Sequence, residues 1–161
     1  MDSRKFRNAL GQFPTGVVVA TARAPTGELI GMTMSSFNSV SLDPPLILFS
    51  VHHKTLSFPA WQSIPRYAIN VLNEEQEQVS NQFARSKGDK WEGISPLTGD
   101  TGVPMLPNAA VVFECETHTR LMVATTKSSS LGSPRCMNIP SIAAGRWYSL
   151  KGATGSLPVR L

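Results

Sequence analysis

Short apolar runs, rich in β-branched residues and separated by Gly- or Pro-containing turns, recur along most of the chain. Such runs have the length of strands rather than of long helices. The predicted strands are residues 16–22, 29–34, 46–51, 66–72, 108–118 and 145–153, with a turn at 24–27 joining the first two. Because strands outnumber helices, the sequence favours a mainly β fold, an antiparallel barrel with short capping helices.

The predicted helices are short and lie between the strands. Ser3, Thr55 and Asn73 each stand where a helix N-cap is expected. The third helix carries acidic residues in its first turn, where the helix dipole favours them. The three segments are residues 3–13, 55–61 and 74–84.

The length and composition fit one domain over residues 1–161. The chain is 41% hydrophobic, which is enough for a real core. Apolar runs stay well short of a membrane span, and the first residues lack the apolar core of a signal peptide. The two cysteines, Cys115 and Cys136, cannot form a disulfide framework. We therefore expect a cytoplasmic protein with free thiols and no membrane partner.

The net charge of +4 is unevenly distributed. Residues 1–120 carry ten Lys or Arg and eleven Asp or Glu, whereas residues 121–161 carry five Lys or Arg and no acid. The basic residues of the second part are scattered singly, without the aromatic interleaving of a nucleic-acid-binding surface. We expect no nucleic-acid partner.

Motifs of serine hydrolases, P-loop proteins, dinucleotide-binding folds and zinc proteases are absent from the sequence. His52 and His53 adjoin at a predicted strand end, so their side chains are expected to diverge, and no metal site is predicted there. Glu114, Glu116 and His118 share one face of a predicted strand, which favours a solvated face over a metal site. Cys115 alternates to the apolar side, as a small buried hydrophobe.

Residues 33–57 are the stretch most suggestive of binding. Serine and threonine cluster on both sides of an aliphatic strand, and Lys54-Thr55 precedes a predicted short helix. Hydroxyls, backbone N–H groups and a cation suit an anionic ligand with a polar edge. Surface-facing Ser and Thr on strands explain the same pattern equally well.

Several segments of the chain, in this order, resemble the flavin reductase family, the small reductase components of two-component flavin monooxygenases. The segments are residues 13–21, 31–50, 54–58, 67–72 and 83–93. The resemblance implies a split antiparallel β-barrel of Greek-key type, usually homodimeric, that binds FMN or FAD. It implies hydride transfer from NADH or NADPH to the flavin, and release of reduced flavin to a partner monooxygenase.

The resemblance also implies a flavin site and no catalytic side chain, since the cofactor supplies the chemistry. A strand edge is expected at the isoalloxazine ring, namely Thr33, Met34, Ser35 and Ser36. The ribityl chain is expected at Ser39, Val40 and Ser41. The phosphate is expected at Ser50, Val51, Lys54, Thr55 and Ser57, with a second phosphate-side element at Phe83, Ala84, Arg85 and Lys87.

Residues 121–144 depart from the family's pattern. The family has a Gly-Asp-His motif here, whose histidine is expected beside the nicotinamide, and this chain lacks it. Read with the frame displaced by one nucleotide, the stretch can encode that motif at the expected place. We therefore hypothesise an out-of-frame translation over residues 121–144, which resequencing of the gene tests.

Three alternatives to a flavin reductase remain open. The loss of the Gly-Asp-His motif favours a flavin-binding barrel that turns over poorly or not at all. An enzyme like pyridoxamine-phosphate oxidase would share the barrel, but residues 1–120 lack the Arg-rich cluster its substrate needs. A module without a ligand leaves the hydroxyl clusters unexplained.

Overall fold

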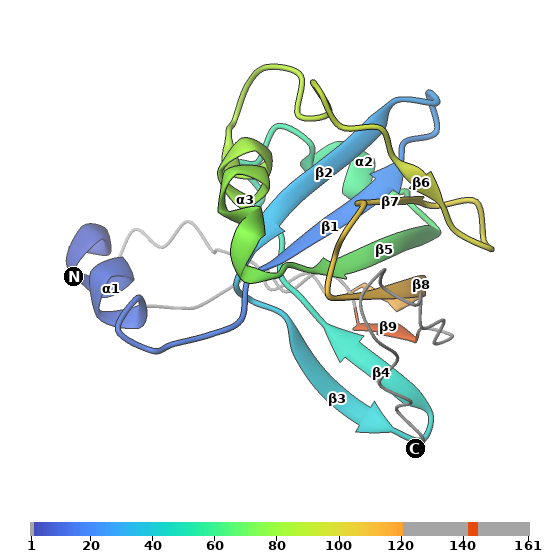
Figure 1. Cartoon of the computed structure of the whole chain (residues 1–161). Helices are drawn as coiled ribbons and strands as arrows, with labels where there is room; N and C mark the ends of the chain where they lie inside the picture. Colours follow the sequence, from blue (N-terminus) through green and yellow to red (C-terminus); the bar gives the residue numbers. More distant parts are fainter. Residues whose placement is uncertain (1, 121–141, 145–161) are drawn as a thin grey trace.

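The computed structural model describes residues 2–120 and 142–144, which form a mainly β fold (Figure 1). The helices are α1 (Ser3–Leu10), α2 (Phe58–Trp61), the 3-10 helix η1 (Glu74–Gln76) and α3 (Glu77–Ala84). The strands are β1 (Val18–Arg23), β2 (Leu29–Met34), β3 (Asn38–Leu42), β4 (Pro45–Leu48), β5 (Arg66–Val71), β6 (Leu97–Thr98), β7 (Pro104–Met105), β8 (Val111–Thr119) and β9 (Ile142–Ala144).

One antiparallel sheet forms the body of the protein, with strand order β2-β1-β5-β8-β9-β4-β3. Strands β6 and β7 form a separate two-stranded ribbon. The two edge strands of the large sheet, β2 and β3, follow each other in the chain but lie at opposite ends of the strand order. In Figure 1 the β3-β4 pair extends away from β2. The mainly β, antiparallel fold predicted from the sequence is confirmed.

The predicted strands with the strongest β-branched character are confirmed almost to the residue. β1 has five successive buried residues, because β2 and β5 flank it and both of its faces are covered. The turn at 24–27 closes with a bond of 2.8 Å from the Gly27 N–H to the Ala24 carbonyl. The strand predicted at 46–51 ends at Leu48, and β3 forms over residues for which the sequence predicts no strand. The strand predicted at 145–153 and residues 121–141 lie outside the described residues.

The prediction for Asn73 is confirmed. Its side chain accepts a bond of 3.0 Å from the Glu75 N–H, and its own N–H donates to Gln76 Oε1 at 3.2 Å, forming a capping box. The prediction for Thr55 is wrong, because α2 begins only at Phe58, with Ser57 as N-cap. The Thr55 carbonyl instead accepts the Phe58 N–H at 2.9 Å in a preceding turn. The first helix ends at Leu10, earlier than predicted.

A buried polar residue, Asn70, joins the core to the β6-β7 ribbon. Its amide donates to the Val19 carbonyl at 2.8 Å and to Thr21 Oγ1 at 2.9 Å. Its carbonyl accepts the Leu106 N–H at 2.8 Å, so its polar groups are satisfied inside the core. In the part of the chain that the structure describes, no helix is long and apolar enough to cross a membrane.

Candidate functional site

A pocket of about 960 Å³ lies over β2, at the upper end of the range of typical ligand sites. Glu28 and the β2 residues 29–33 form its floor. One wall is the segment before and within α2, residues 52, 54–57, 59 and 60. The other wall is residues 83–90, from the end of α3 into the following loop. In Figure 1, β2 runs between α3 and α2.

The residues lining the pocket are mainly cationic where they are charged. Lys54, Arg85, Lys87 and Lys90 contribute positive charges, against Glu28 and Asp89. The Asp89 carboxylate also accepts the Trp91 N–H at 2.8 Å. This balance favours an anionic ligand such as a phosphate ester.

Lys90 ties the second wall to the floor. Its Nζ donates to the Gly31 carbonyl on β2 at 2.8 Å and to the Phe83 carbonyl at the end of α3 at 3.1 Å. The Gln82 amide adds bonds to the carbonyls of Lys90 and Glu92, at 3.0 and 2.8 Å. Burial lowers the pKa of the Lys90 ammonium below its usual value. The loop after α3 is therefore fixed against β2 by side-chain bonds rather than by a strand ladder.

Gly31 allows α3 to approach β2 closely. A Cβ atom at this position would lie 2.5 Å from a ring carbon of Phe83, whose side chain is fully buried. The Phe83 ring also contacts Trp91 edge to face, with ring centroids 5.1 Å apart. The absence of a side chain at residue 31 thus sets the position of the wall that carries Arg85 and Lys87.

Of the four hydroxyl residues that line the pocket, Thr33 and Ser57 differ in their hydrogen bonding. Thr33 Oγ1 donates to the Ser80 carbonyl of α3 at 2.6 Å, which leaves its lone pairs to accept. Ser57 Oγ is buried and has no hydrogen-bond partner among the described residues. Lys54 lies in the same pocket wall, and a buried hydroxyl without a partner fits a phosphate oxygen as its acceptor. The residues present therefore fit a flavin phosphate.

Half of the predicted flavin residues line this pocket. They are Thr33, Lys54, Thr55, Ser57, Phe83, Ala84, Arg85 and Lys87. The pocket does not include Met34, Ser35, Ser36, Ser39, Val40, Ser41, Ser50 or Val51.

Met34, Ser35 and Ser36 directly follow Thr33, whereas Ser39, Val40 and Ser41 lie on β3, and Ser50 and Val51 follow β4. Met34 and Val51 are buried among apolar side chains, so only their backbone groups could reach a ligand. Ser36 Oγ accepts the Ser50 N–H at 3.1 Å, joining the end of β2 to the segment after β4. The ring and ribityl positions stay predictions.

Sequence reasoning missed several residues that line the pocket, including Glu28, His52, Asp89 and Lys90. The apolar pattern of residues 29–34 predicts a core strand and does not indicate that the strand lines a pocket. Lys90 follows a predicted phosphate-side element closely in the sequence, and this proximity is the feature that could have indicated its place in the pocket.

The prediction that His52 and His53 diverge is wrong. Their rings stack with centroids 4.5 Å apart and planes at 24°, because both residues lie in a turn rather than on a strand. His52 Nδ1 accepts the Lys54 N–H at 3.1 Å. Among the described residues no group of three or more His, Cys, Asp or Glu could hold a metal ion.

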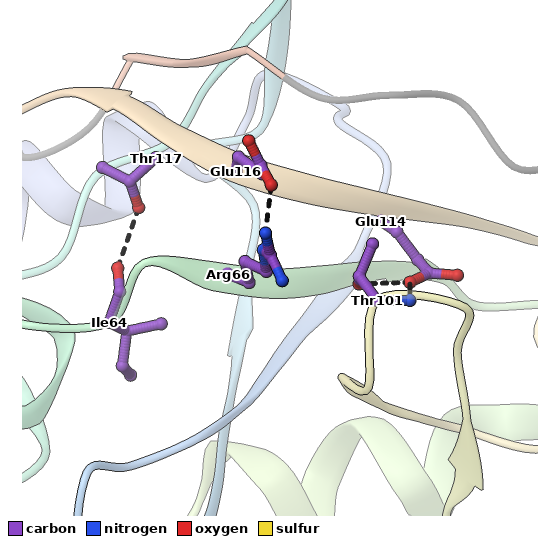
Figure 2. Close-up of polar contacts among 6 residues, drawn as sticks. All are labelled: Ile64, Arg66, Thr101, Glu114, Glu116 and Thr117. Atoms are coloured by element: carbon purple, nitrogen blue, oxygen red, sulfur yellow. Dashed lines mark hydrogen bonds and ion pairs between the residues drawn. The ribbon is translucent and has the colours of Figure 1, made fainter.

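The prediction that Glu114 lies on a solvated face of β8 is wrong, because its side chain is buried. Its carboxylate accepts the Asp100 N–H at 2.9 Å. It also accepts the Thr101 N–H at 2.8 Å and the Thr101 hydroxyl (Figure 2). Glu116 is exposed and pairs with Arg66 at 2.8 Å. Cys115 is buried, as predicted.

A mainly β, antiparallel fold with a pocket over β2 that is lined mostly by cations defines the class of protein. Comparison with known families then identifies the group. The flavin reductase like domain family matches residues 10–129, and the chain belongs to it. The resemblance seen in the sequence is confirmed.

Curated relatives carry reductase names. The chain is 46% identical over 114 residues to FMN reductase (NADH) SmoA of Agrobacterium fabrum, covering 71% of this chain and 64% of the relative. It is 40% identical over 117 residues to stachydrine N-demethylase reductase subunit Stc3 of Rhizobium meliloti, covering 73% of this chain and 51% of the relative. The matched stretch thus spans between half and two thirds of these relatives.

Solved structures share the fold. Nitrilotriacetate monooxygenase component B from Mycobacterium thermoresistibile superposes with a TM-score of 0.77 at 29% identity, covering 98% of this chain and 79% of that one. NADH:FAD oxidoreductase SgcE6 of Streptomyces globisporus, in complex with NAD and FAD fragments, gives 0.73 at 29% identity, covering 89% and 78%.

Proposed function

We propose that this chain is a flavin reductase, which takes hydride from NADH or NADPH and reduces FMN or FAD. The reduced flavin then leaves for a separate monooxygenase. The observation that carries the proposal is the cation-lined pocket over β2, with the buried hydroxyl of Ser57 in its wall. Bound flavin supplies the hydride-accepting ring, and the residues of this chain bind and orient it.

The names of the relatives support the nucleotide and partner assignments. SmoA is named an FMN reductase that uses NADH, and SgcE6 an NADH:FAD oxidoreductase. A reductase component of a trigonelline monooxygenase from Acinetobacter baylyi is 36% identical over 115 residues. We therefore favour NADH as the donor and a monooxygenase as the recipient of reduced flavin.

Within the site, we assign the phosphate to the pocket and the ring to its Thr33 end. Lys54, Arg85 and Lys87 would neutralise the phosphate, and Ser57 would donate to it. Ser35 and Ser36 would face the edge of the ring, with Ser39 to Ser41 along the ribityl chain. Alignment of nicotinamide with flavin needs only positioning, so no acid or nucleophile is assigned.

The first test is turnover by the 161-residue chain. NADH and NADPH oxidation is followed with and without added FMN or FAD. Turnover that depends on added flavin is expected. Flavin binding without turnover would contradict the enzymatic assignment.

The second test separates the phosphate from the ring. Riboflavin has the ring and ribityl chain of FMN but no phosphate. The double variant R85M/K87M should weaken FMN at least tenfold, since each charge-assisted bond contributes roughly 1.5–3 kcal/mol, and leave riboflavin affinity unchanged. The exposed Lys5, on α1, provides a control variant, K5M, for loss of charge outside the pocket. Equal weakening of both ligands would place the phosphate elsewhere.

We also propose a homodimer in the cytoplasm. The strand β3 supports the dimer, because it exposes Val40 (51%) and Leu42 (68%) and is an edge strand among the described strands. Light scattering after size exclusion measures the mass in solution. A V40K/L42K variant should then become monomeric, and a wild type that is monomeric at micromolar concentration would exclude the proposal.

The non-catalytic alternative depended on residues 121–144. Of these, the structure describes only β9, which pairs with β4 and β8. No contact of the described residues favours that alternative over the reductase.

A further inference from the structure

The pocket is longer than the phosphate of a mononucleotide requires. Its floor extends along β2 from Thr33 back to Glu28, five residue steps of about 3.3 Å each, or about 16 Å. The ring is assigned to the Thr33 end. The pocket therefore continues past the phosphate toward the β1-β2 turn.

Both walls follow the floor in that direction. In the α3 wall, Ser80 bonds to Thr33, and Lys90 bonds to Gly31, closer to the start of β2. The other wall begins near Ser50, which bonds to Ser36 beyond the end of β2. The lining on this side ends at Ala60, and the chain then leads to Arg66, at the start of β5 and hence at the end of the sheet where β2 begins. Floor and walls thus line one open pocket that extends from Thr33 to Glu28.

The chemistry changes along this length. The ammonium group of Lys90 is fixed at Gly31, midway along the floor. At the far end the lining includes the apolar surface of Leu29 and the exposed carboxylate of Glu28. A flat base suits an apolar surface, and a carboxylate accepts hydrogen bonds from the hydroxyls of a ribose. A cation between these ends suits a diphosphate.

We propose that the Glu28 end of the pocket is a subsite for the adenosine half of a dinucleotide. The proposal rests on the proposed function and deepens it, since FAD and NADH both carry this group. Glu28 accepts from the ribose hydroxyls and disfavours a phosphate on the ribose, as in NADPH. Leu29 packs against the base.

The test uses a variant that fills the subsite and one that changes only its charge. Replacement E28W places a large side chain at the far end, and E28Q keeps the shape. T26W is the matched control, in the same hairpin turn but outside the pocket lining. FAD and FMN are titrated by flavin fluorescence and AMP by isothermal titration calorimetry, and KM is measured for NADH and for reduced nicotinamide mononucleotide.

If the adenosine belongs to FAD, E28W should weaken FAD about tenfold, the usual scale for loss of one stacked base, and leave FMN unchanged. If it belongs to NADH, KM for NADH should rise by a similar factor while kcat and KM for the mononucleotide stay constant. E28Q should give the same pattern with a smaller change, and T26W should give none. Unchanged FAD-to-FMN and NADH-to-mononucleotide ratios in E28W would overturn the subsite.

Failure of the proposed function is recognised separately. It would appear as a wild type that neither binds flavin nor oxidises NADH. AMP titration still reports on the subsite in that case. Binding of AMP that E28W abolishes supports the subsite, and absence of AMP binding to the wild type overturns it.

Discussion

The ammonium nitrogen of Lys90 lies 2.8 Å from the carbonyl oxygen of Gly31, which joins the loop after α3 to the middle of β2. The same nitrogen lies 3.1 Å from the carbonyl of Phe83, at the end of α3. Two backbone carbonyls from separate elements thus share one cation. This bond fixes the wall that carries Arg85 and Lys87 at the pocket.

Replacing Lys90 by methionine, K90M, removes both bonds and keeps most of the side-chain volume. Each hydrogen bond contributes about 0.5–1.5 kcal/mol net, so loss of the two bonds should lower the unfolding free energy by about 1–3 kcal/mol at neutral pH. Urea denaturation measures it, with K5M as the control. Stability equal to wild type would show that the two bonds contribute nothing.

The loss of unfolding free energy caused by K90M should also depend on pH. Burial lowers the pKa of Lys90 in the folded state below 10.5, its ordinary value, so the unfolded state binds more protons between these two pKa values. Stability from Lys90 therefore rises with pH through this window. The neutral amine keeps two N–H donors, enough for both carbonyls. The stability gap between wild type and K90M should widen up to about pH 10, and a narrowing gap would contradict the cause.

Substitution of Gly31 by alanine should separate β2 from α3. The new Cβ would lie 2.5 and 2.6 Å from two ring carbons of Phe83, and the buried ring cannot move aside. Overpacking of this kind costs about 1–3 kcal/mol. Gly16 is the control, because a Cβ there meets nothing within 4 Å.

A double-mutant cycle identifies the cause of that loss. In an F83L background the ring is absent, so G31A should cost clearly less than in the wild type. Additive effects of the two substitutions would show that Gly31 matters for another reason. Calorimetry or urea unfolding of the four proteins supplies the comparison.

Glu114 and Glu116 lie two residues apart on β8 (Figure 2). Their replacement by alanine should have very different effects on stability. Glu114 is buried and accepts two backbone N–H groups, which E114A would leave without an acceptor. The expected loss is about 2–4 kcal/mol, since each buried unsatisfied donor costs roughly 1–3 kcal/mol. E116A removes only an exposed ion pair and should cost less than about 1 kcal/mol. Equal losses would refute the structural role of Glu114.

The parts of the fold that the sequence predicts well depend on local signals. The run of β1 is apolar on both faces because it lies inside the sheet, and that is visible without the partners. The helix after Asn73 is marked by its own capping box and acidic first turn. Such features need only a few neighbouring residues, so the pattern alone identifies them.

The missed features depend on contacts between distant segments. The pocket exists because Phe83 packs over Gly31 and Lys90 reaches back to β2, over 52 and 59 positions of sequence. Glu114 is buried because the turn at Asp100 and Thr101 closes over it. The strand pattern records neither event, since a glycine or an alternating glutamate looks the same on an open sheet. Family resemblance, rather than periodicity, supplied the site residues.

Cys115 should be unreactive in the folded protein. Burial and the neighbouring Glu114 carboxylate raise the pKa of its thiol to about 12, from an ordinary value of 9.0. Since the thiolate is the nucleophile, the folded protein keeps the thiol inert at mildly alkaline pH. In a C136S variant, a disulfide reagent should label the native protein far more slowly than the protein in urea. Rapid labelling of the native protein would place Cys115 at the surface.

The same shift makes stability fall as the solution becomes alkaline. Between about pH 9 and 12 the unfolded chain loses the Cys115 proton while the folded chain keeps it, so the folded state binds more protons and stability decreases. The shift of Tyr67 acts in the same direction, because burial raises its pKa above the ordinary value. In C115A the fall should therefore be smaller but still present. Urea midpoints from pH 8 to 10.5 measure it, and identical pH slopes for C115A and wild type would show that the thiol titrates normally.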